Sequence, residues 1–145
     1  MGKGASLSER DPQVFFTGKR FGYRHPNTGE TLIEPRYAAA MPFSEGLAAV
    51  RVKVGDDNKW GFIDASGAMV IEPRFAGATF FSEGLAAVML SSFFDGKQVY
   101  IDRSGDVVID REFDVCYPFE PTGTTTVVED EEGRTIDRTG QFVGP

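Results

Sequence analysis

The side chains that could carry out catalysis are few in this 145-residue chain. It has one cysteine, Cys116, and one histidine, His25, which lie far apart in the sequence. These counts exclude a metal site built from several Cys or His ligands. A Cys–His nucleophile pair is not expected, because Cys116 lies in an apolar run and His25 in a Pro-Asn loop. No phosphate-binding glycine loop or nucleophile elbow occurs. The sequence therefore predicts no catalytic residue, no metal and no cofactor.

Carboxylates recur along the chain instead of forming one constellation. Glu34, Glu72 and Asp110 repeat at equal spacing, and Glu45 is repeated by Glu83. An acid–base pair of a hydrolase is a single arrangement in one cleft, whereas these residues repeat with the architecture. We interpret them as turn contacts or ion pairs between repeats. A hydrolase with a carboxylate pair is the least favoured alternative, and we expect that the chain is not an enzyme.

Self-similarity with a period of 38 residues dominates the sequence. The block Phe43–Val50 recurs as Phe81–Val88, and Ile33–Arg36 recurs as Ile71–Arg74. A weaker copy begins at Lys97. A period of this length indicates stacked supersecondary units, each of which buries its core against its neighbours.

Each copy has the composition of short strands. Lys59–Asp64 combines aromatic and β-branched residues, and it ends in the turn sequence Asp64–Gly67. Pro35 and Pro73 are expected to end the second strand, since proline cannot donate to a ladder. A third strand follows the Ser-Glu-Gly turn. The sequence predicts an all-β fold of tandem repeats of about 38 residues. Each repeat is expected to be a three-stranded antiparallel meander, stacked as a solenoid or a partly closed barrel or propeller-like array.

The repeat also sets the expected domain organisation. We expect a flexible N-terminus over residues 1–13 and one β domain over residues 14–145. Its repeats are expected at about residues 20–58, 59–96 and 97–132, with a partial copy at 133–145. Closure of the array through the segment around Val14–Phe16, or homodimerisation through strand edges, would each remove an open edge.

Charge is unevenly distributed and restricts the class of partner. The net charge is −7, made of +3 over residues 1–55 and −10 over residues 56–145. An acidic chain is a poor nucleic-acid binder, because phosphate contacts need clustered Lys and Arg. No apolar run approaches the roughly 18 residues of a membrane span, and residues 1–13 lack the apolar centre of a signal peptide. We expect a cytoplasmic protein with no nucleic-acid or membrane partner.

The repeated residues resemble the WG-repeat family, which is common in bacteria and named for a Trp-Gly pair. The resemblance covers roughly residues 20–143 and is carried by Trp60–Asp64, Gly67, Val70–Pro73 and Phe81–Ala86. The third copy departs from the pattern, because Gln98-Val99 replaces Trp-Gly and residues 119–123 replace Phe-Ser-Glu-Gly-Leu. The resemblance implies a small β-repeat scaffold with a binding role, and it supplies no catalytic residues.

The copies differ most in the connections between successive repeats. Residues 55–58 align with residues 93–96 and with residues 129–133. Variable loops on a repeat scaffold are where binding usually occurs. We predict that two aromatic residues anchor a partner there and that the acidic run attracts a basic one, unless the two rings fold back as a local cap. The predicted binding residues are Phe93, Phe94, Asp95, Glu129, Asp130, Glu131 and Glu132.

The leading functional prediction is a non-catalytic module that recognises a protein or peptide through these loops. The alternative is an aromatic platform of Phe21, Trp60 and Tyr100 that binds a glycan or peptide. That alternative requires exposed rings, and packing between repeats is the competing interpretation of these residues.

Overall fold

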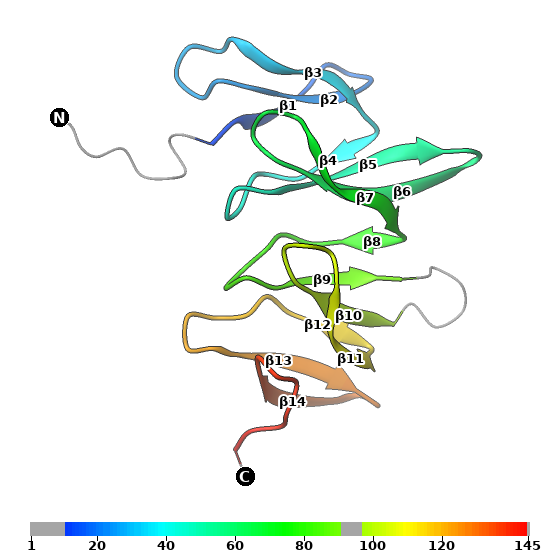
Figure 1. Ribbon diagram of the computed structural model, residues 1–145, viewed down its shortest axis with the longest axis vertical. Helices are drawn as coiled ribbons and strands as arrows, with labels where there is room; N and C mark the ends of the chain where they lie inside the picture. The colour runs from blue at the N-terminus through cyan, green and yellow to red at the C-terminus, as the bar shows by residue number, and fades with distance from the viewer. Residues whose placement is uncertain (1–10, 91–96, 145) are drawn as a thin grey trace, which may run out of the picture. The chain divides into compact units, whose positions relative to one another are not determined.

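The computed structural model describes residues 11–90 and 97–144. Over these ranges the chain is all-β, as predicted, and its strands form small antiparallel sheets, none of which closes into a barrel (Figure 1). A search of the same ranges finds no helix that is long and apolar enough to cross a membrane.

Each sheet is made of strands that are consecutive along the chain. The first sheet has the order β1-β2-β3, with bounds Gln13–Phe16, Phe21–Arg24 and Thr31–Tyr37. The second has the order β4-β5-β6-β7, with bounds Ala39–Ala40, Ala48–Val54, Asp57–Ile63 and Met69–Phe75. The third has the order β8-β9-β10-β11, with bounds Gly77–Ala78, Ala86–Met89, Gln98–Ile101 and Val107–Phe113. The fourth has the order β12-β13-β14, with bounds Val115–Cys116, Thr124–Glu129 and Glu132–Asp137.

The sheets do not coincide with the expected repeat units. The second sheet takes β4 and β5 from one repeat and β6 and β7 from the next, because the hairpin that pairs Val54 with Asp57 continues the ladder across the repeat boundary. The expected three-stranded meander per repeat therefore differs from the observed grouping. The short strands β4, β8 and β12 have two residues each, which is too short to show an alternating pattern.

The expectation that proline ends the second strand is wrong. Pro35 lies within β3 and Pro73 within β7, and each strand continues to an aromatic residue. Both strands lie at the edge of their sheets, where the N–H that proline lacks is not needed for a further ladder.

The glycine of the Trp-Gly pair permits a close approach of two backbones opposite these prolines. A Cβ built on Gly61 would lie 2.6 Å from the carbonyl oxygen of Ile71 and 2.8 Å from the nitrogen of Pro73. Gly22 has the same surroundings in the first sheet. A side chain at Gly22 or Gly61 would therefore overlap the backbone of the facing strand unless the two strands moved apart.

Two hydrophobic clusters account for much of the core. The chain divides into compact units at residues 1–73 and 74–145, and each unit contains a cluster between two of its sheets. The cluster of the first unit comprises Tyr23, Ile33, Tyr37, Phe43, Ala48, Val50 and Ile63. That of the second comprises Leu85, Ala87, Tyr100, Ile109, Phe113, Cys116, Phe119, Val127 and Ile136. A single domain over residues 14–145 remains a prediction.

Buried tyrosines attach the core to the connecting loops. Tyr23 and Tyr100 occupy the same repeat position and are fully buried. The Tyr23 hydroxyl donates to the Met41 carbonyl oxygen at 2.7 Å, and that of Tyr100 donates to the Tyr117 carbonyl oxygen at 2.6 Å. Burial raises the pKa of both hydroxyls, so both remain protonated donors.

Candidate functional site

The predicted acidic run forms the tip of the β13–β14 hairpin. Glu129 pairs with Glu132, so Asp130 and Glu131 are the two turn residues. Their φ angles are 53° and 67°, as a type I′ turn requires. For a residue other than glycine, this left-handed backbone conformation costs roughly 1–2 kcal/mol. Other contacts must therefore hold the acidic tip in place.

Side chains from neighbouring strands supply those contacts. The Arg111 guanidinium donates to both carboxylate oxygens of Glu129, at 2.7 and 3.2 Å. One carboxylate oxygen of Asp114 accepts the Asp130 N–H at 2.9 Å, and the other accepts from Lys97 Nζ at 2.6 Å. The hydrogen bond from Arg111 lowers the pKa of Glu129, and that from Lys97 lowers the pKa of Asp114. Both carboxylates are therefore ionised at neutral pH.

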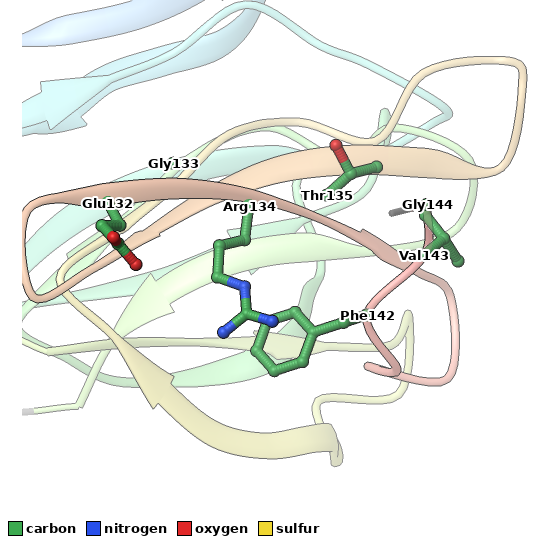
Figure 2. Close-up of a pocket in the computed structure, with 7 residues that line it drawn as sticks. All are labelled: Glu132, Gly133, Arg134, Thr135, Phe142, Val143 and Gly144. Atoms are coloured by element: carbon green, nitrogen blue, oxygen red, sulfur yellow. The ribbon is translucent and has the colours of Figure 1, made fainter.

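A cleft of about 620 Å³ opens beside this tip (Figure 2). Residues 132–135 of β14 line one side and residues 142–144 the other. The Arg134 guanidinium lies over the Phe142 ring, with its carbon 3.7 Å from the ring centroid, and the Arg111 guanidinium lies 4.7 Å from the same centroid. Figure 2 shows Arg134 reaching the Phe142 ring, with Glu132 two residues earlier on the same strand.

The far wall of the cleft is attached to β14 by backbone contacts. The Val143 N–H donates to the Thr135 carbonyl oxygen at 2.9 Å, and Ile136 forms a bridge with Phe142. Phe142 also packs against the core cluster of the second unit. The cleft is thus lined by the Phe142 ring with the Arg134 guanidinium over it, and by one carboxylate, that of Glu132.

Four of the seven predicted binding residues lie together in the structure. Glu129 to Glu132 form the tip, and Glu132 lines the cleft. The other three predicted residues, Phe93, Phe94 and Asp95, lie outside the described residues.

The cationic and aromatic residues of the cleft were not predicted from the sequence. Arg111 occupies the position of Pro35 and Pro73, and Arg134 occupies that of the repeat glycine. These two replacements were the available signal. Phe142 carried none, because its position is not part of a repeated block.

The proposed aromatic platform is only partly exposed. Tyr100 is fully buried and presents no ring face to solvent, whereas Phe21 and Trp60 are half-buried. Phe21 stacks on Phe16, with the ring centroids 4.6 Å apart.

Neither a reactive thiol nor a metal centre is found in the described ranges. Cys116 is buried, and burial raises the pKa of its thiol to about 12. Among the residues that the structure describes, no group of His, Cys, Asp and Glu side chains is arranged to hold a metal ion.

Comparison with known families finds one match. The sequence model of the WG containing repeat matches residues 22–53, 60–91 and 100–123. No curated protein and no solved structure was found to match the chain.

Proposed function

The chain belongs to the WG-repeat family, and from this premise we propose that it is a non-catalytic module that recognises a basic segment of a protein or peptide. Successive repeats are proposed to stack as an array, with the divergent hairpin connections as the recognition elements. Phe93 and Phe94 remain proposed anchors, and a cytoplasmic location remains part of the proposal.

The observation that supports this function best is the fixed acidic tip beside a cleft. Asp130 and Glu131 are kept in a left-handed conformation by the contacts of Asp114 and Glu129. Positions of such local strain are concentrated at functional sites. The exposed carboxylates of Asp130, Glu131 and Glu132 attract cations, and neither ion pair of this region, Lys97–Asp114 or Arg111–Glu129, neutralises them.

The cleft supplies the second element of recognition. Its floor pairs the Arg134 guanidinium with the Phe142 ring, and its volume lies within the range of about 300–1,000 Å³ that is typical of ligand sites. If a side chain of a bound peptide enters the cleft, the residues next to it in the peptide lie beside the acidic tip. The arrangement thus favours a peptide that carries an aromatic residue next to Lys or Arg.

A peptide-display selection tests the proposal. We expect the full chain to enrich peptides that combine Lys or Arg with an aromatic residue. The variant Asp130→Asn/Glu131→Gln/Glu132→Gln should bind the enriched peptides about tenfold more weakly at low salt, since each exposed charge contributes about 0.2–1 kcal/mol.

A matched control removes acidic charges from the equivalent β5–β6 turn. The variant Asp56→Asn/Asp57→Asn should bind the same peptides within about twofold of the wild type, because its charges lie in a different hairpin. Equal losses in both variants would show that overall charge, and not the β13–β14 tip, attracts the peptide. Absence of any enrichment for basic peptides would contradict the proposal.

A further inference from the structure

The hairpin loop between β1 and β2 carries charge of the opposite sign to the acidic tip. It contains Lys19 and Arg20, whereas the equivalent β5–β6 and β13–β14 turns contain carboxylates. Both cations are exposed, and among the described residues neither forms an ion pair with a carboxylate. We propose that this loop binds the acidic tip of a second copy of the chain. This inference rests on the proposed function and names the partner of its acidic site.

Hydrogen bonds within the loop hold the two cations in a defined geometry. The Thr17 N–H donates to the Arg20 carbonyl oxygen at 3.0 Å, and the Thr17 hydroxyl oxygen accepts the Arg20 N–H at 3.3 Å. The Arg20 guanidinium donates to the Lys19 carbonyl oxygen at 3.2 Å. Gly18 supplies the positive φ of 99° at the turn. Because the loop is ordered in the free chain, it loses little conformational entropy when it binds.

An aromatic ring lies beside these cations. Phe16 and Phe21 are the last pair of the β1–β2 ladder, and their rings stack, yet 56% of Phe16 remains exposed. Phe21 directly follows Arg20 in the chain. The hairpin thus presents an aromatic residue next to a basic one, which is the composition proposed above for the recognised segment. Aromatic residues and Arg are also enriched where proteins contact one another.

Charge complementarity identifies the occupant of the loop. The acidic tip exposes three carboxylates that no ion pair neutralises, those of Asp130, Glu131 and Glu132. At physiological salt the Debye length is about 8 Å, so these nearby charges outweigh the repulsion between distant parts of two acidic chains. A nucleic acid or a lipid surface is disfavoured, because the two cations of this loop are too few to hold a polyphosphate in a chain of net charge −7.

The loop and the tip are different surfaces, so the contact between two copies is heterologous. Each copy can place its loop on one neighbour and accept the loop of another at its tip. Repetition of this contact closes a ring or continues as an open chain. A contact of about six residues on each side is far smaller than the 20–30 residues of a standard interface, so the association should be weak.

Charge reversal on both surfaces tests the contact. Sedimentation equilibrium of the full chain, at concentrations up to about 1 mM, measures its self-association. The variant Lys19→Glu/Arg20→Glu reverses the loop, and Glu131→Lys/Glu132→Lys reverses the tip. Each variant alone carries like charges on both surfaces and should associate at least about tenfold more weakly than the wild type. An equimolar mixture of the two should associate within about threefold of the wild type, because each loop then meets a tip of opposite charge. Both variants keep a negative net charge, so overall attraction does not explain such a recovery.

A matched pair of single variants controls for the change in net charge. Lys19→Glu should weaken the association about threefold. Lys53→Glu makes the same change at an exposed residue of β5 and should leave the association unchanged. Far-ultraviolet circular dichroism checks that each variant is folded. If a reversed tip fails to fold, the neutral variant Asp130→Asn/Glu131→Gln/Glu132→Gln replaces it and should also associate more weakly.

The outcomes separate this inference from the proposed function. A wild type that is monomeric at about 1 mM, equal effects of Lys19→Glu and Lys53→Glu, or a mixture of the folded reversed variants that does not associate would each overturn the second copy as the partner. The proposed function would still hold if the peptides enriched by display bind the neutral tip variant more weakly than the wild type. Peptides that bind both equally well would contradict the proposed function, whether or not the chain associates with itself.

Discussion

The close backbone approach at Gly61 leads to the most direct prediction about the fold. In Gly61→Ala the new Cβ would lie 2.6 Å from the Ile71 carbonyl oxygen, and the next two atoms, both of the Pro73 backbone, are at 2.8 and 3.0 Å. Tolerable contacts begin at about 3.4 Å, so the strands must separate by about 0.8 Å. Backbone atoms cannot rotate away as a flexible side chain does.

The expected magnitude combines two opposing effects. Overpacking costs about 1–3 kcal/mol, and contact with backbone on both sides places this substitution near the upper end. Replacing glycine by alanine also reduces the entropy of the unfolded chain, which stabilises by about 0.4–1 kcal/mol. We therefore expect Gly61→Ala to lower the free energy of unfolding by about 2 kcal/mol.

Urea unfolding followed by far-ultraviolet circular dichroism measures this change. Gly133→Ala is the control, because its Cβ would meet only Thr126 Cγ2 at 3.8 Å and its φ is not positive. The control should match or slightly exceed the stability of the wild type. A loss below about 0.5 kcal/mol in Gly61→Ala would refute the argument that close packing requires this glycine.

Three further predictions concern the turns and the core. Glu131→Gly should raise the free energy of unfolding in urea by about 1 kcal/mol, because glycine adopts the observed positive φ without a steric cost. An unchanged free energy of unfolding would contradict the inferred backbone strain at Glu131. Hydrogen bonds from the hydroxyl two residues later lower the pKa of Asp64, Asp102 and Asp137. These hydrogen bonds thus stabilise the folded chain at pH values above the unfolded pKa of about 4. This stabilisation is lost as the pH falls through the lower folded pKa. Replacing all three aspartates by Asn should therefore reduce the fall in the free energy of unfolding between about pH 5 and 2. An unchanged dependence on pH would contradict the role of these hydrogen bonds. Cys116, whose thiol pKa is raised to about 12 by burial, should react with a thiol reagent at pH 8 only after unfolding; rapid labelling of the native chain would disprove this.

The parts of the fold that depend on local sequence could be predicted. The turn at Asp64–Gly67 was expected from its Asp, Ser and Gly residues, and the Asp64 carboxylate accepts from the Ser66 and Ala68 N–H groups as such a turn requires. The Ser-Glu-Gly turns were also expected. Ser44 and Leu47 exchange both backbone hydrogen bonds there.

Features that depend on sheet order could not be predicted. Whether proline ends a strand depends on its place in the sheet, and Pro35 is tolerated because β3 is an edge strand opposite Gly22. The residues around Pro35 would read the same in an edge strand and in a central strand, so they do not show whether the strand continues through the proline. Likewise, the short strand β12 exists only because β13 lies beside it.

The candidate site was predictable in its charges and not in its shape. Glu129 to Glu132 were identified as the densest acidic run, and they form one hairpin tip. The cleft depends on Arg134 and Phe142, which are eight residues apart and meet only because the turn between them reverses the chain. No periodicity marks that contact.

The most direct test of recognition at the β13–β14 tip is a nuclear magnetic resonance titration of the ¹⁵N-labelled full chain with a peptide that carries an aromatic residue next to Lys. We predict that chemical shifts change at the amides of residues 129–135 and 142–144, while Gly55 in the equivalent β5–β6 turn does not shift. Saturable shifts at Gly55 in place of the β13–β14 tip, or no shifts at the tip and the cleft, would contradict the account.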